Sequence, residues 1–260
     1  MITRIVTGAV LAIVSVAVII YGGLLYFFVM LALALLALNE YFALMKRYRP
    51  LPLGGFLAVG AMMYMAWFQT PRGLLAAIAI GFLLAAVSGL LIGAKPGVSV
   101  RIAVTLLGIL WVGLGFAHLL MLRDLDAGRE IVLTVIFGTW AGDTMAYFVG
   151  RFFGATPMVP HLSPKKTWEG FAGGAIGTVL LVVFASLYTP LTAIQSLLLG
   201  VVIAVVGPAG DLFESLLKRD VQIKDSGKGL PGHGGVLDRF DALLWAGVAS
   251  YYLLTVGFGY

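Results

Sequence analysis

The sequence predicts an all-α polytopic integral membrane protein with about nine transmembrane helices. Three observations support this: 61% of the 260 residues are hydrophobic, only 11% are charged, and the apolar residues fall into long runs. A soluble globular domain has about a quarter of its residues charged, because its surface faces water. The composition therefore excludes a soluble globular protein, and its hydrophobicity excludes a disordered chain.

Nine apolar runs divide the chain, each close to the roughly 20 residues that a helix needs to cross a bilayer. Strands of membrane barrels have only about 10 residues and alternate in polarity, so these runs indicate helices. The predicted helices cover residues 5–22, 24–45, 51–68, 73–92, 99–122, 130–150, 169–188, 193–217 and 239–258.

Two of these elements need a separate argument. The first run follows Arg4 and resembles a signal peptide, but no small-residue cleavage site follows and the second run begins at once. We therefore predict a retained first helix. The run 169–188 contains two overlapping GxxxG pairs, which let helix backbones approach closely, so we expect a packing role for it.

The distribution of basic residues predicts the orientation. With nine helices, all of the 17 Lys and Arg residues except Arg72, Arg123 and Arg129 fall on the side of the N-terminus. Cytoplasmic loops carry an excess of Lys and Arg, so the N-terminus is expected inside and the C-terminus outside. The net charge of +5 is explained by these loops and does not indicate a nucleic-acid partner.

Charged residues concentrate in residues 207–241, where the eighth predicted helix ends and a loop follows. Asp211, Glu214, Ser215 and Lys218 are spaced by three or four residues and share one helical face. A carboxylate at the centre of a membrane helix costs about 3 kcal/mol and usually faces a cavity or a partner. We favour a functional site over the alternative, an internal Glu214–Lys218 pair that only eases insertion.

The same spacing recurs at Asp238 and Asp241, where the ninth predicted helix begins. Two acid pairs on adjacent helices can converge on a hard cation, and Mg²⁺ binds through one or two carboxylates plus substrate phosphates. The glycine-rich loop between them lets the backbone approach phosphates, and Arg219, Lys224 and Lys228 supply positive charge. Because Cys is absent, a thiolate nucleophile and a cysteine zinc site are excluded.

A second polar cluster is expected at Lys165 and Lys166, in the loop before the seventh predicted helix. These lysines either bind a substrate phosphate or only set topology and touch anionic lipid headgroups. Asp143, in the sixth predicted helix, either ligates a metal or holds a lysine, with a purely structural partner as the alternative. For Glu40, in the second predicted helix, we favour a structural role.

The charged positions of the C-terminal region form an extended motif. It consists of Ser215-x-x-Lys218-Arg219-x-x-x-x-Lys224-Asp225, followed by His233-Gly234-Gly235-x-x-Asp238-Arg239-x-Asp241. This motif closely resembles the signature of the phosphatidate cytidylyltransferases, also called CDP-diacylglycerol synthases. The segments SPKKTWEG (163–170) and GDTMAYFVGR (142–151) are also similar to that family, so the resemblance covers most of the chain.

The resemblance implies a reaction in which CTP and phosphatidate give CDP-diacylglycerol and pyrophosphate. It implies Mg²⁺ as cofactor, with a monovalent cation such as K⁺ as a further candidate. It also implies a homodimer in the bacterial inner membrane, with the active site on the cytoplasmic side. We expect one membrane domain over 1–260, with N-terminal helices in 1–122 and the catalytic helices in 130–260.

The resemblance and the residue patterns together define the candidate site. Asp211 and Asp238 are the candidate metal ligands. The candidate catalytic residues are Asp211, Lys218, Lys224, Asp225, His233, Asp238 and Asp241. The candidate substrate-binding residues are Ser215, Arg219, Lys228, Arg239, Lys165, Lys166 and Asp143.

Two alternative functions remain open. A CTP-dependent polyprenol or lipid kinase would use similar groups on another acceptor. An ion-coupled secondary transporter would place polar residues near the midplane on repeat-related broken helices. Here the polar residues crowd the inner ends of the predicted helices and no repeat is visible, so the transporter is the weaker alternative.

Overall fold

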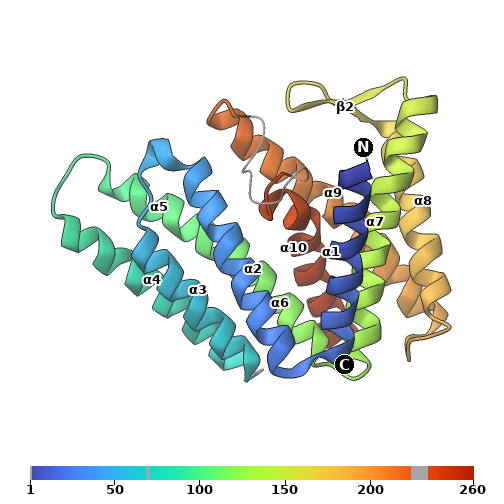
Figure 1. Ribbon diagram of the computed structural model, residues 1–260, viewed down its shortest axis with the longest axis horizontal. Coiled ribbons are helices and arrows are strands. Elements are labelled where there is room, and N and C mark those ends of the chain that lie inside the picture. The colour runs from blue at the N-terminus through green and yellow to red at the C-terminus, as the bar shows by residue number, and fades with distance from the viewer. Residues whose placement is uncertain (1, 69–70, 224–233) are drawn as a thin grey trace. The chain divides into compact units, whose positions relative to one another are not determined.

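The computed structural model describes residues 2–68, 71–223 and 234–260. These residues are helical almost throughout (Figure 1). Short π-helical turns, Ile109–Gly113 and Leu253–Gly257, join α5 to α6 and extend α10. The helices are α1 (Ile2–Tyr21), α2 (Gly23–Leu44), α3 (Pro52–Trp67), α4 (Pro71–Ile92), α5 (Val98–Gly108), α6 (Leu114–Arg123), α7 (Gly128–Phe153), α8 (Trp168–Ala185), α9 (Ala193–Asp220) and α10 (Leu237–Tyr252).

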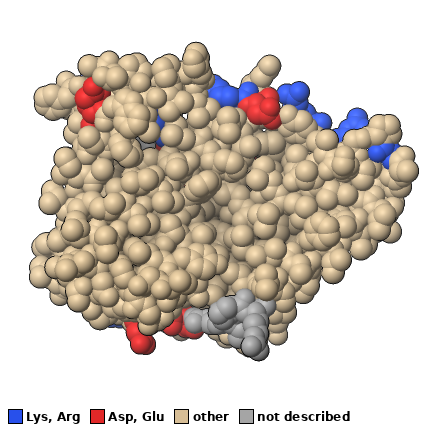
Figure 2. All heavy atoms as spheres, turned by 180° about the vertical axis from the view of Figure 1, so that it is seen from behind, with Lys and Arg blue, Asp and Glu red and all other residues tan. Residues whose placement is uncertain are grey.

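Each of the nine predicted runs contains a helix, as expected of an all-α membrane protein. Among the described residues, seven helical segments are long and apolar enough to cross a membrane: Gly23–Leu44, Gly73–Ile92, Val98–Arg123, Gly128–Phe153, Trp168–Ala185, Ala193–Asp220 and Leu237–Gly257. Ala12–Tyr21 and Pro52–Trp67 are apolar but shorter. In Figure 2 the visible charged atoms lie near the upper and lower edges of the face, and the broad area between them is uncharged, as lipid contact requires. The count of nine spans and the orientation stay predictions.

A β-hairpin between α7 and α8 was not predicted. Its strands, β1 (Pro157–Val159) and β2 (Ser163–Thr167), are antiparallel, with Pro157 opposite Thr167 and Val159 opposite Ser163. The sequence predicted only a connecting loop here. Strands this short show no alternating pattern, and proline in both of them argues against a strand from sequence alone.

The chain forms two compact units, which are described separately. The first comprises residues 1–121 and 221–240, and the second residues 122–220 and 241–260. Within the first, buried tyrosines of α2 join distant helices: Tyr26 Oη donates a hydrogen bond to the Leu119 carbonyl oxygen (2.9 Å), and Tyr41 Oη to that of Val104 (2.8 Å). Within the second, α8 packs against both α7 and α9. The single domain expected from the sequence stays a prediction.

Close packing of α7 and α8 depends on glycine. A Cβ atom on Gly174 would lie 2.8 Å from the carbonyl oxygen of Gly142, and one on Gly170 would lie 2.9 Å from that of Ala146. Only glycine permits such an approach between backbones. The packing role predicted for the overlapping GxxxG pairs is confirmed.

Replacement of Gly173 by alanine should destabilise this helix pair. The added Cβ would lie 2.5 Å from Val149 Cγ2 and 2.6 Å from Val149 Cβ. A β-branched side chain in a helix has one strongly preferred rotamer, so Val149 cannot turn away. Overpacking of this kind costs about 1–3 kcal/mol, which should appear as a lower unfolding temperature in detergent. Gly60→Ala on α3 is the matched control, since its Cβ would meet nothing within 4 Å, and an equal loss in both variants would contradict the argument.

Candidate functional site

A cavity of about 350 Å³ lies within the second unit, between α7, α8 and α9. Its charged lining residues are Asp143 from α7, Lys165 and Lys166 from β2, and Asp211 from α9. The remaining lining is mainly glycine, alanine and larger apolar side chains, and it reaches Ile203, two helical turns or about 12 Å along α9 from Asp211. The cavity therefore combines a charged end with an apolar interior, in the size range of small-molecule sites.

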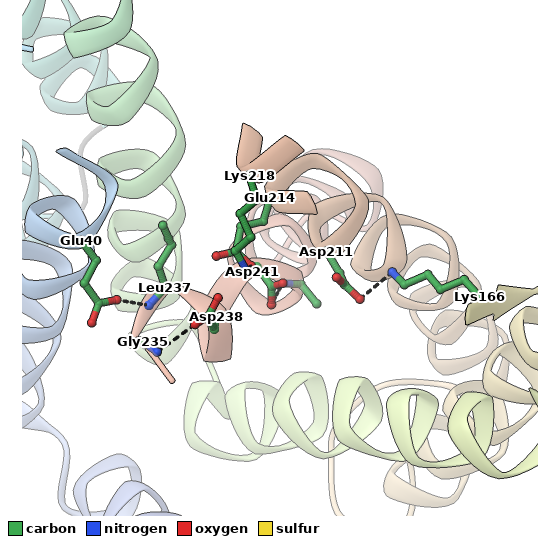
Figure 3. Close-up of polar contacts among 10 residues, drawn as sticks. Glu40, Lys166, Asp211, Glu214, Lys218, Gly235, Leu237, Asp238 and Asp241 are labelled. Carbon is green, nitrogen blue, oxygen red and sulfur yellow. Dashed lines mark hydrogen bonds and ion pairs between the residues drawn. The ribbon is translucent and has the colours of Figure 1, made fainter. Parts of the chain in front are cut away.

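An ion pair lies at the charged end of the cavity. Nζ of Lys166 lies 2.5 Å from Oδ2 of Asp211 (Figure 3). The two side chains are 28% and 38% exposed, respectively. Partly exposed ion pairs contribute little to stability, so a ligand can take either partner at small cost. The structure thus brings together two of the predicted site residues, which are 45 positions apart in the sequence.

Two side chains at the start of α8 hold the hairpin that carries the lysines. Oγ1 of Thr167 accepts a hydrogen bond from the backbone N–H of Gly170 (3.1 Å) and caps the helix. The carboxylate of Glu169 accepts hydrogen bonds from the backbone N–H groups of Ala155 and Thr156, both at 3.1 Å to Oε2. Glu169 was not among the predicted site residues, although an acidic residue two positions after a threonine cap is a recognisable helix start.

Glu169→Leu should lower catalytic turnover by loosening the hairpin. Without the carboxylate, two N–H groups at the base of the hairpin lose their acceptor, and Lys165 and Lys166 lose a fixed position. Misplacement of about 1 Å can cost about 100-fold in rate, so a loss of about 10- to 100-fold is expected. Steady-state turnover is measured for Glu169→Leu and for Glu169→Gln. The Gln variant is the control, because its amide oxygen still accepts a hydrogen bond. Wild-type turnover in Glu169→Leu would contradict it.

Buried acidic groups continue along α9 and onto α10 within the second unit. Glu214 is buried, and its Oε2 lies 3.0 Å from Nζ of Lys218 one turn later. The carboxyl groups of Glu214 and Asp241 lie close to each other, and Oδ1 of Asp241 accepts a hydrogen bond from the backbone N–H of Ala242 (2.8 Å). Two carboxylates this close repel each other unless a proton or a cation lies between them. This pair therefore favours cation binding or proton sharing near the C-terminal end of α9.

Pro208 alters α9 next to the cavity. It lies inside the helix and has no backbone N–H, so the Ala204 carbonyl oxygen lacks its usual intrahelical donor. Both residues line the cavity. A turn further on, Gly210 lets α10 approach, since a Cβ there would lie 2.5 Å from the carbonyl oxygen of Asp241. Small and helix-breaking residues thus shape this part of α9.

In the first unit, Asp238 lies in the first turn of α10. Its Oδ2 accepts the backbone N–H of Gly235 (2.8 Å), and Oε2 of Glu40 on α2 accepts that of Leu237 (2.8 Å) (Figure 3). A structural role was favoured for Glu40 from the sequence. Its partner lies 197 positions away along the chain, which no local pattern could indicate.

The other predicted site residues are distributed as follows. Ser215 is half-buried on α9, and Arg219 is exposed near its end, where its Nε donates to the Leu162 carbonyl oxygen (3.3 Å). Arg239 is exposed on α10. Four predicted residues, Lys224, Asp225, Lys228 and His233, lie outside the described residues.

Similarity to known proteins identifies the family of this chain. The model of the cytidylyltransferase family matches residues 2–256. The chain belongs to the cytidylyltransferase family. A phosphatidate cytidylyltransferase of Bacillus subtilis is 34% identical over 263 residues, covering 97% of each chain. One of Staphylococcus saprophyticus is 33% identical (93% of this chain, 94% of that one), and one of Aquifex aeolicus is 39% identical over 149 residues (57% and 56%).

The family assignment confirms the resemblance drawn from the charged motif. Because the family match spans both units, the helices before the motif belong to the family's fold as well. The match includes the cavity between α7, α8 and α9 and the Glu40–Leu237 contact. Both features are thus parts of a cytidylyltransferase.

The carboxylate oxygens at the cavity fit a magnesium ion that is bound jointly by the protein and its substrates. Among the described residues, no group of three or more His, Asp or Glu side chains could hold a metal unaided. Mg²⁺ commonly keeps several waters and binds through one or two carboxylates plus substrate phosphates, so no such group is required. Asp211 presents a carboxylate at the cavity that is 38% exposed. Because Asp211 and Asp238 belong to different units, their joint role as ligands stays a prediction.

Proposed function

We propose that this protein transfers the cytidylyl group of CTP to phosphatidate, giving CDP-diacylglycerol and pyrophosphate. The observation that carries this proposal is the cavity of the second unit, which has lysines and carboxylates at one end and an apolar interior. A substrate with an anionic head and an apolar body fits that arrangement. The family membership and the relatives named phosphatidate cytidylyltransferase support the same activity.

The reaction needs positioning and charge neutralisation more than proton transfer. A phosphate oxygen of phosphatidate forms a bond to the α-phosphorus of CTP, and the bond from that phosphorus to the β-phosphate oxygen breaks. Pyrophosphate leaves with the electron pair of the broken bond. A phosphomonoester has its second pKa near 6, so its oxygen is already largely ionised at neutral pH and requires no strong base. The obstacle is the approach of two anions.

We assign Lys166 and Lys165 to the lipid phosphate. Both line the cavity whose interior is apolar, which suits acyl chains and the glycerol backbone better than a triphosphate. When the lipid phosphate binds, Lys166 exchanges its contact with Asp211 for a charge-assisted hydrogen bond to the phosphate. Asp143, in the same lining, then holds the lysines in place.

We assign the remaining basic groups of the motif to CTP. Lys218 follows Glu214 on the buried face of α9, where it can reach a phosphate near Asp211. The other candidates are Arg219, Lys224, Lys228, His233 and Arg239, with Ser215, Asp225 and Asp241 as polar partners. Mg²⁺, when bound, neutralises charge on the triphosphate and on the leaving pyrophosphate. Asp211 and Asp238 would hold it, and K⁺ is a candidate for a second cation.

We further propose how the protein sits in the cell. Nine spans with the N-terminus inside would place the charged ends of α9 and α10 in the cytoplasm, where CTP is present. The excess of Lys and Arg on that side supports this orientation, and a bacterial inner membrane suits the bacterial relatives. We propose a homodimer as the assembled state.

Pyrophosphate release tests the proposed function directly. The full chain, purified in mild detergent, is supplied with CTP, phosphatidate and Mg²⁺, and then with each omitted in turn. Release that requires all three supports the proposal. Formation of CDP and a phosphorylated lipid with a polyprenol or diacylglycerol acceptor, without pyrophosphate release, would favour a lipid kinase. No release from folded protein would overturn the proposal and lead to ion-transport assays.

A further inference from the structure

Glu40 is a buried carboxylate far from the charged motif in the sequence. It lies on α2 in the first unit, its residue surface is 9% exposed, and the helix around it is apolar. A carboxylate at such a position is costly unless it has a defined partner. Glu40 lies outside the motif segments 142–151, 163–170 and 215–241, and none of the proposed substrate contacts uses it.

The partner of Glu40 is the N-terminus of α10. Leu237 is the first residue of that helix, and its backbone N–H donates to Oε2 of Glu40 at 2.8 Å. The first N–H groups of a helix have no intrahelical acceptor, and Val236, directly before the helix, has no side-chain acceptor to offer. The carboxylate of Glu40 fills that role from another helix, and the helix dipole favours a negative charge there.

The same turn is built around Asp238. Its Oδ2 accepts the backbone N–H of Gly235 at 2.8 Å. Gly234 has a φ of +80°, and a Cβ atom there would lie 2.8 Å from Oδ2 of Asp238. The turn is therefore shaped to fit the Asp238 carboxylate closely. Glu40 holds the residue next to Asp238, so the two carboxylates fix one turn from two helices.

We infer that Glu40 is a positioning residue that holds the start of α10, and with it the carboxylate of Asp238, in the geometry that the active site requires. This inference rests on the proposed function, in which Asp238 is a metal ligand. Glu40 touches neither substrate nor metal in this role. It acts through the backbone of Leu237, at the position directly before Asp238.

Three substitutions separate positioning from a general contribution to stability. Glu40→Ala removes the acceptor. Glu40→Gln keeps an amide oxygen that can accept the same N–H. Tyr41→Phe, the neighbouring position on α2, removes a partly buried hydrogen bond of similar length, to the Val104 carbonyl oxygen, without touching α10. If Glu40→Ala does not fold, Glu40→Asp replaces it, because its shorter side chain withdraws the carboxylate.

Two measurements are made on each full-length variant in detergent. Hydrogen–deuterium exchange of peptides covering residues 234–241 reports on the turn without any activity. Pyrophosphate release, titrated with Mg²⁺, gives the half-saturating Mg²⁺ concentration and the KM for phosphatidate. For Glu40→Ala we expect about tenfold faster exchange in this segment and about a tenfold higher Mg²⁺ requirement, with the phosphatidate KM unchanged. Glu40→Gln should stay within about threefold of wild type, and Tyr41→Phe should match wild type in both measurements.

Several results would overturn the inference. One is unchanged exchange of residues 234–241 in Glu40→Ala. Another is a rise in the Mg²⁺ requirement of Tyr41→Phe equal to that of Glu40→Ala, and a third is a Gln variant as impaired as the Ala variant. If the wild-type protein releases no pyrophosphate, the proposed function fails on its own, and the exchange data still decide whether Glu40 holds the turn.

Discussion

Replacing Asp211 by Asn is expected to lower pyrophosphate release from CTP by at least about a thousandfold, since a bound metal supplies several kcal/mol of charge stabilisation and each 1.36 kcal/mol is tenfold in rate. Asn has nearly the same shape but no charge, and a neutral amide is a poor ligand for a hard cation. Asp211 lies at the charged end of the cavity, where it pairs with Lys166. The measurement is single-turnover release of pyrophosphate at saturating CTP and phosphatidate.

A matched substitution on the same helix separates the site from the helix itself. Asp220→Asn, at the last residue of α9, makes the same chemical change outside the cavity and should retain wild-type turnover. Unfolding temperatures of both variants should equal that of the wild type within a few degrees, because the partly exposed Lys166–Asp211 pair contributes little stability. Near-normal turnover in Asp211→Asn would remove Asp211 from the metal site. Asp238→Asn is expected to show the same loss as Asp211→Asn.

The helices could be predicted from the sequence because bilayer thickness sets their length. A run of about 20 apolar residues has one stable form in lipid, so no tertiary information is needed. The glycine spacing in α8 likewise predicted close packing, because the absence of a Cβ atom is known from the residue type alone. The hairpin at residues 157–167 could not be predicted. It depends on hydrogen bonds from Ala155 and Thr156 to Glu169, which arise only when the chain returns to α8.

The site was predictable as a set of residues but not as a set of contacts. Asp211 was identified because a carboxylate is costly in an apolar helix, Lys166 because it belongs to a pair of lysines in a loop, and Asp238 because it belongs to the charged motif. Which side chains meet is decided by how the helices pack: Lys166 joins Asp211 across 45 residues, and Glu40 joins Leu237 across 197. A single sequence gives no measure of such long-range contacts. The cavity likewise depends on how the elements pack, because its walls come from three helices and a hairpin.

Replacing Lys166 by Ala is expected to raise the KM for phosphatidate by about 10- to 100-fold, because a hydrogen bond to a charged group contributes about 1.5–3 kcal/mol. Lys166 lines the cavity whose apolar interior suits acyl chains, so its loss should affect the lipid more than the nucleotide. The KM for CTP should change by less than about threefold. Initial rates in mixed micelles, with the phosphatidate surface fraction and the CTP concentration varied separately, measure both constants.

The pattern of the two constants distinguishes the competing assignments of Lys166. If Lys166 holds the triphosphate, the KM for CTP rises and that for phosphatidate does not, which would contradict the lipid assignment. If it only sets topology, neither constant changes.

Lys95→Ala removes the same charge from an exposed loop of the first unit, outside the cavity, and should leave both constants unchanged. Lys166→Arg should recover part of the phosphatidate affinity, because a guanidinium also binds phosphate but with a different reach and geometry. Lys166→Met replaces the lysine with a neutral residue of similar length. If phosphatidate affinity recovers in part with Arg and not with Met, the lipid phosphate requires a positive charge at this position.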